Sequence, residues 1–238
     1  PRTSSAASDV YKRQDLYLID PKDDKVIWKS ESQNIPLRTK GSSKPMYLNN
    51  TIFIARDNGS VSSYRAMDGT LNWFTIISSR SGRNDLESQR DAEMQISVEN
   101  DKLYYGHFQG ELNAIDINTG RVIWTSPFSF INDIVINNNS IYGSTTNTQI
   151  VSIDQASGFL NLRSKTSNEQ FTSPFIIDNL IMTFTTEGTL VAFNEDGTNV
   201  YEKKFDLDLH PQTKFILDGN KLYFQTVDGD IVHFIITI

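Results

Sequence analysis

Histidines and closely spaced carboxylates are the side chains of this sequence that could carry acid–base or metal chemistry. The three histidines, His107, His210 and His233, have no cysteine, second histidine or acidic residue at the spacing that a metal site requires. Asp206 and Asp208 alternate in a segment that we expect to be a strand, so both carboxylates would face one side. A paired-carboxylate acid–base site there is the alternative interpretation. The sequence therefore predicts no catalytic residue and no metal site.

Composition excludes several further classes of function. The chain has 238 residues and a net charge of −7, with its 22 basic residues scattered, which argues against a nucleic-acid surface. It has no cysteine, so it has no disulfide, zinc–thiolate site or thiol nucleophile. No apolar run reaches the length of about 18 residues that a membrane-spanning helix needs. Glycines occur singly, and none forms a phosphate-binding loop.

The elements that must position any site are set by an internal repeat. Residues 114–124 contain the pattern Ala114-x-Asp116-x-x-x-Gly120-x-x-x-Trp124. Related segments cover residues 18–28 and 63–73, and weaker copies cover 152–162 and 192–201. A unit repeated in this way indicates an array of supersecondary modules.

Each unit is predicted to be a propeller blade of four antiparallel strands. Polar pairs such as Asn-Asn mark one turn of the unit, and Gly59, Gly110, Gly188 and Gly229 mark another. Gly188 precedes Gly229 by 41 residues, a period typical of a blade. Gly59 precedes Gly110 by 51 residues, so we expect an insertion within residues 78–91. The fold class is therefore all-β, with about five to six blades.

Three tryptophans recur at one position of the repeat. Trp28, Trp73 and Trp124 are expected at the end of each outer strand, where a large ring can fill the wedge between blades. An aromatic platform for a ligand is the alternative interpretation. Leu162 and Tyr201 replace tryptophan in later units, a change that packing tolerates better than ligand binding.

Two regions with different character divide the chain. Residues 1–14 are rich in Ser and Ala, lack the apolar core of a signal peptide and do not match the repeat. We expect them to be a non-native or disordered tail. Residues 15–238 are expected to form a partial propeller domain, the C-terminal part of a longer protein.

The repeat resembles that of quinoprotein (PQQ-like) propellers, and residues 15–238 resemble the BamB family of outer-membrane assembly lipoproteins more closely. Residues 35–38 (Ile-Pro-Leu-Arg) and 91–93 (Asp-Ala-Glu) carry that resemblance, with 57–62 and 171–174 in register. It implies an eight-bladed, non-enzymatic scaffold without a cofactor. It also implies a lipid anchor upstream of this chain, the periplasmic face of the outer membrane as location, BamA POTRA domains as partner, and unfolded outer-membrane proteins as clients.

The resemblance also implies the partner-binding residues. They are Ile35, Leu37, Arg38, Asp91 and Glu93. An arginine beside two apolar side chains is a suitable hot spot, and an acidic pair could orient it. The alternative is that the apolar pair plugs a blade and the acidic pair is solvated. Isoleucine at position 35 and glutamate at position 93 depart from the leucine and aspartate of the family.

Two other functions stay open at this point. A fragment of a PQQ-dependent dehydrogenase would need calcium-ligating carboxylates and, typically, vicinal cysteines, and the latter are missing. The other candidate is a luminal stress-sensor propeller, in which the Asn-x-Ser/Thr sequons at Asn49, Asn58 and Asn138 would be acceptors for glycans.

Overall fold

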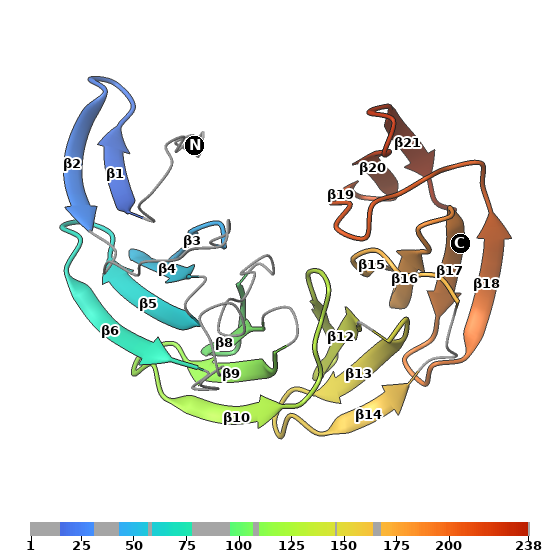
Figure 1. The fold of residues 1–238 in the computed structure, drawn as a ribbon, viewed down its shortest axis with the longest axis horizontal. Helices are drawn as coiled ribbons and strands as arrows, with labels where there is room; N and C mark the ends of the chain where they lie inside the picture. The colour runs from blue at the N-terminus through green and yellow to red at the C-terminus, as the bar shows by residue number, and fades with distance from the viewer. Residues whose placement is uncertain are drawn as a thin grey trace, which may run out of the picture.

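The fold of this chain is an open arc of antiparallel sheets (Figure 1). A computed structural model describes residues 15–30, 43–56, 59–77, 96–106, 110–145, 147–163 and 168–237. In these ranges it contains 21 strands, which form six sheets. The predicted all-β propeller with four-stranded blades is thereby confirmed.

Four of the sheets are complete blades whose strands pair in chain order. The first has β3 (Met46–Leu48), β4 (Thr51–Ala55), β5 (Ser60–Arg65) and β6 (Leu71–Ile76). The second has β7 (Ser97–Glu99), β8 (Lys102–Tyr105), β9 (Leu112–Asp116) and β10 (Val122–Ser126). The third has β11 (Val135–Asn137), β12 (Ser140–Ser144), β13 (Ile150–Asp154) and β14 (Leu160–Arg163). The fourth has β15 (Phe175–Ile177), β16 (Leu180–Phe184), β17 (Thr189–Phe193) and β18 (Asn199–Lys204).

The two remaining sheets lie at the ends of the arc (Figure 1). One pairs β1 (Leu16–Asp20) with β2 (Lys25–Ser30), and the other contains β19 (Ile216–Asp218), β20 (Lys221–Gln225) and β21 (Ile231–Ile235). The complete blades show that a three-residue strand begins each unit and lies toward the centre of the arc.

The hairpin turns follow from residue types that tolerate positive φ. Asn49 and Asn50 have φ of 47° and 61°, the conformation of a type I′ turn. In the last sheet Gly219 takes the first turn position with φ of 60°, as a type II′ turn requires. Thr148 occupies the turn where other units have glycine and has φ of 57°.

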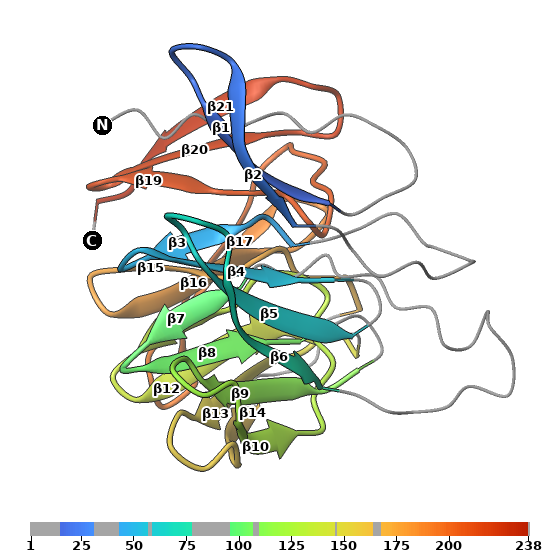
Figure 2. The same ribbon diagram turned by 90° about the vertical axis from the view of Figure 1, so that its left-hand side faces the viewer.

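The chain connections divide the arc into two faces, which Figure 2 shows edge-on. The turns between the first and second and between the third and fourth strands of each blade lie on one face, the left in this view. We call this the turn face. The ends of the second and third strands that lead into their hairpin, and the described links from β10 to β11 and from β18 to β19, lie on the opposite side. We call this the connection face.

Neighbouring blades are joined by a tryptophan that lies on a glycine turn. The Trp73 ring packs on Gly120 of the next blade, where an added Cβ would approach ring carbons to 2.6 Å. Its Nε1 donates to the Ile117 carbonyl at 2.8 Å, and Thr75 Oγ1 donates to the Gly120 carbonyl at 2.5 Å. Only a residue without a side chain allows this approach.

The same contact recurs at the other blade boundaries. Trp28 lies on Gly69 and Trp124 on Gly158, and both donate Nε1 to a backbone carbonyl of the next blade. Leu162 takes the position of the ring against Gly197. The prediction that each outer strand ends at tryptophan is wrong by two or three residues, because the strand continues to the connection face.

Apolar side chains between the blades form the core. Leu103, Tyr104 and Leu112 are fully buried in the cluster that joins the first three complete blades. A second cluster is built around the fully buried Phe184, whose ring lies 5.4 Å from that of Phe224. The apolar side chains of the second and third strands thus pack between neighbouring blades.

The aspartate of the repeat caps the turn that receives the tryptophan. Asp116 Oδ1 accepts from the Thr119 amide and hydroxyl, both at 2.8 Å. These bonds, the hydroxyl first, hold the pKa of Asp116 below its ordinary value. In the preceding blade Arg65 and Asp68 stand in place of Asp116 and Thr119, and their ion pair, at 2.5 Å, closes the turn.

Acid should weaken these turns. Asp154 makes the same contacts as Asp116, and its pKa is also lowered, chiefly by the Ser157 hydroxyl. A carboxyl whose pKa is lower in the folded state stabilises above its unfolded pKa of about 3.9, and that stabilisation is lost as pH falls through the folded value. We expect Tm to fall between pH 6 and pH 3. The fall should shrink in Asp116→Asn/Asp154→Asn, which keeps the acceptor oxygens; an unchanged fall would contradict this origin.

One predicted element is absent from the structure. Asp206 and Asp208 do not alternate along a strand, because β18 ends before them and they lie in the connection to β19. This connection lies beside the β16–β17 hairpin, and its Leu209 amide donates to the Thr186 carbonyl at 2.8 Å. The alternating apolar residues that suggested a strand, Phe205, Leu207 and Leu209, pack into the aromatic cluster instead.

Candidate functional site

The residues predicted to contact a partner lie outside the described residues. They are Ile35, Leu37, Arg38, Asp91 and Glu93. Their segments connect β2 to β3 and β6 to β7, so each links an outer strand to the inner strand of the next blade. The insertion expected within residues 78–91 belongs to the second of these segments and lies outside the described residues too.

The described ends of both segments converge on one hairpin. Ser43, which follows the first segment, donates its amide to the Ala55 carbonyl at 3.1 Å, and its Oγ accepts from the Ala55 amide at 3.0 Å. Ile77, which precedes the second segment, donates to the Gly59 carbonyl at 3.0 Å. Ala55 and Gly59 flank the β4–β5 turn, so the two segments join the same blade at neighbouring points.

A buried arginine at this hairpin was not predicted. Arg56 is 5% exposed and donates to Ser62 Oγ at 2.7 Å and to the Tyr64 hydroxyl at 3.1 Å. Burial by itself would raise the pKa of Tyr64, but a hydrogen bond with Ser30 and the charge of Arg56 hold it below the ordinary value. The sequence Ala-Arg-Asp-Asn-Gly gave no signal of burial, because it reads as an exposed hairpin turn.

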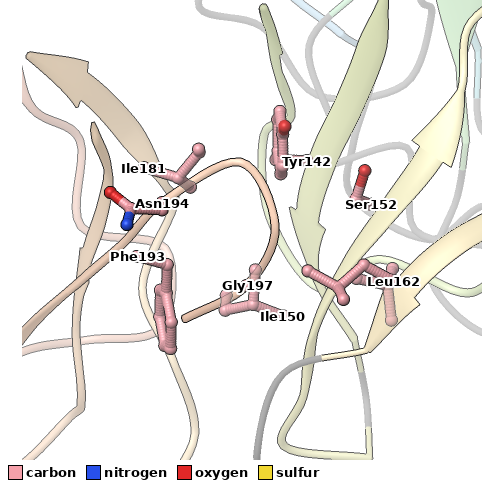
Figure 3. A pocket seen from close by; sticks show the side chains of 9 residues that line it. Tyr142, Ile150, Ser152, Leu162, Ile181, Phe193, Asn194 and Gly197 are labelled. Carbon is pink, nitrogen blue, oxygen red and sulfur yellow. The ribbon is translucent and has the colours of Figure 1, made fainter. Parts of the chain in front are cut away.

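The seam between the third and fourth complete blades contains a cavity (Figure 3). Tyr142, Ser152 and Leu162 line one side of it, and Phe193 and Gly197 line the other. Its volume is about 10 Å³, room for no more than about one water molecule. It is a packing defect between blades and cannot hold a cofactor.

The predicted chemistry-bearing residues do not converge. His210 Nδ1 accepts from the Gln212 amide at 3.2 Å, and His233 stacks on Tyr223 with 4.7 Å between ring centroids. His107 lies outside the described residues. Among the described residues, no three His, Asp or Glu side chains come close enough to share a metal ion. That part of the chain also has no helix long and apolar enough to cross a membrane.

The predicted glycines and tryptophans lie at the blade turns and seams. Gly59, Gly120, Gly188 and Gly229 have φ between 72° and 93°. Gly110 lies just before β9. The three tryptophans, Trp28, Trp73 and Trp124, contact neighbouring blades as described above.

Comparison with known proteins relates this arrangement to a family. The family described as "Outer membrane protein assembly factor BamB" matches residues 6–159 and 135–236. The BamB of Escherichia coli K12 is 26% identical over 197 residues, which cover 82% of this chain and 50% of that protein. The chain therefore spans about half the length of this relative.

Solved structures share the fold. The crystal structure of BamB from Moraxella catarrhalis matches with a TM-score of 0.80 and 21% identity, over 92% of this chain and 66% of the other. A quinohemoprotein alcohol dehydrogenase from Pseudomonas putida HK5 matches with a TM-score of 0.67 and 12% identity, over 88% of this chain and 48% of the other. The second likeness concerns the propeller fold alone. Since the family match covers nearly all of the repeat region, this chain belongs to the family of the outer membrane protein assembly factor BamB.

Proposed function

We propose that this chain is part of a non-enzymatic scaffold that helps to assemble outer-membrane proteins and binds the POTRA domains of BamA. Membership of the BamB family is the observation that carries this proposal. The scaffold acts at the periplasmic face of the outer membrane, held there by a lipid anchor upstream of this chain. Unfolded outer-membrane proteins are its clients.

The contact is proposed at the two segments that interrupt the repeat. Both attach to the β4–β5 hairpin through Ser43 and Ile77, so the described ends of the segment that carries the arginine and of the segment that carries the carboxylates lie at neighbouring points. Arginine with apolar neighbours is a frequent hot spot, and opposite charges nearby can fix its orientation. The dehydrogenase alternative gains no support from the described residues, in which no carboxylates gather.

Binding to POTRA domains should depend on Arg38 and Asp91. We expect Arg38→Ala and Asp91→Ala in the full-length protein each to weaken capture by the immobilised POTRA region of its own BamA by about tenfold or more, as hot-spot truncations do. Biolayer interferometry would measure the change. Arg121→Ala, on the turn face, is the control and should bind as the wild type does.

Two outcomes would contradict this proposal at different levels. Wild-type affinity in both variants would remove the assignment of these residues while leaving the scaffold function in place. Failure of the wild-type protein itself to bind any POTRA domain would remove the proposed partner.

A further inference from the structure

A second cavity opens on the connection face, at the third complete blade. Its volume is about 310 Å³, the lower end of the range for small-ligand sites. Phe128 and Ser129, from the link between β10 and β11, form one wall. Thr145, Asn147 and Gln149, from the β12–β13 hairpin, and Arg163, at the end of β14, form the rest.

Among the described residues, Arg163 is the only charged side chain that lines this cavity. Its guanidinium carbon lies 5.5 Å from the centre of the Phe128 ring. Contact with an aromatic face holds the planar group in place, so less side-chain freedom is lost when it binds a ligand. In the described part of the chain no Asp or Glu forms an ion pair with Arg163. The cavity thus presents a fixed, uncompensated positive charge.

Polar groups beside Arg163 also suit a negatively charged ligand. Asn147 lines the cavity, and its side-chain amide has two donor hydrogens. The Ser129 hydroxyl, in the opposite wall, is buried and has no hydrogen-bond partner among the described residues. Because that oxygen is buried, the polar contacts open to a ligand are those of Arg163 and Asn147. The net charge of the chain is −7, so this cationic spot is a local exception.

We propose that this cavity binds a carboxylate of a peptide segment, with Arg163 pairing with both carboxylate oxygens and Asn147 donating a further hydrogen bond. Arginine matches a carboxylate with two parallel N–H···O bonds, a geometry that lysine cannot reproduce. The carboxylate can come from an acidic side chain or from a chain end, since both present the same two oxygens. The site is separate from the proposed POTRA contact at the β4–β5 hairpin and does not depend on it.

Three short peptides distinguish the sources of the carboxylate. They are acetyl-Gly-Glu-Gly-amide, acetyl-Gly-Gln-Gly-amide and acetyl-Gly-Gln-Gly with a free carboxyl end. Titrations into the ¹⁵N-labelled chain would be followed by NMR at the Arg163 Nε–H and at the amides of Ser129, Thr145 and Gln149. We expect the first or the third peptide, or both, to shift these signals at millimolar concentration, and the second to leave them unchanged.

Variants test the role of each side chain. Arg163→Gln should weaken peptide binding at least tenfold, and Arg163→Lys should weaken it less, because the charge remains without the planar fork. Arg121→Gln makes the same exchange on the turn face and should bind as the wild type does. Arg38→Ala should also leave peptide affinity unchanged, which separates this site from the POTRA contact. Equal binding of the Glu and Gln amides, unchanged affinity in Arg163→Gln, or shifts confined to other residues would each overturn the proposal.

Discussion

Trp73→Ala should lower the free energy of unfolding by about 3–5 kcal/mol, the usual cost of truncating a large buried ring. The ring is 8% exposed and fills the seam between two blades, against Phe53 on one side and Gly120 on the other. Its removal leaves a cavity and deprives the Ile117 carbonyl of its donor. Urea unfolding followed by far-UV circular dichroism would measure the loss, since this signal does not depend on the tryptophan itself.

Two variants separate the contributions of the Trp73 ring. Trp73→Phe keeps most of the apolar contact and loses the bond to Ile117, so we expect a cost of roughly 1–2 kcal/mol. Phe74→Ala removes a neighbouring ring that is 45% exposed, and it should cost less than Trp73→Ala by at least about 2 kcal/mol. If Phe74→Ala were as damaging as Trp73→Ala, the ring would not be the element that joins the blades.

Local residue chemistry is why the blades could be predicted from the sequence. The Asn49-Asn50 pair and Gly229 have the positive φ that their turns need, and a turn is decided by residues adjacent in the chain. The number of blades then followed from the period of the repeat. The prediction failed at Asp206, where polar and apolar residues alternate as they do in a strand. In the structure this segment is a connection between β18 and β19, and its apolar side chains are packed against the core.

Contacts between blades could not be read from the sequence in the same way. Trp73 donates to Ile117, 44 residues later, and Trp124 donates to Gln155, 31 residues later. Such pairs meet only when one blade is placed against the next, and the spacing of residues within one repeat does not determine that placement. The burial of Arg56 was missed for a different reason: its partners Ser62 and Tyr64 lie on the next strand of the same hairpin, whose sequence indicates an exposed turn.

The difference between residues that join the blades and segments that connect them indicates where function can vary in this fold. Residues that join the blades, such as Trp73 and Gly120, are fixed by close contact and leave little freedom for change. On the connection face the link from β18 to β19 is likewise packed into the core, through Phe205, Leu207 and Leu209, whereas Ser43 and Ile77 attach the ends of their segments to the β4–β5 hairpin by backbone hydrogen bonds. The Arg163 cavity lies on that face, and the two segments proposed to bind POTRA domains join the blade there, at Ser43 and Ile77.

Gly120→Ala should be among the most damaging single-atom additions in the chain. A methyl group at this position would meet the Trp73 ring at 2.6 Å, and the residue has φ of 72°, which costs an alanine roughly 1–2 kcal/mol by itself. Overpacking adds roughly 1–3 kcal/mol, so we expect a loss of about 2–5 kcal/mol by urea unfolding. Gly219→Ala is the matched control, with φ of 60° and no atom within 4 Å of the added methyl.

A double-mutant cycle tests whether the clash with Trp73 is the cause. In a Trp73→Ala background the added methyl of Gly120→Ala no longer meets the ring and only Thr75 Oγ1, at 2.9 Å, stays close, so its cost should fall toward that of Gly219→Ala, about 1–2 kcal/mol. The coupling between the two substitutions should therefore be about 1–3 kcal/mol, as for residues in direct contact. Additive costs would mean that the glycine is needed for its backbone conformation alone, and that the ring and the turn do not hold the blades together as a unit.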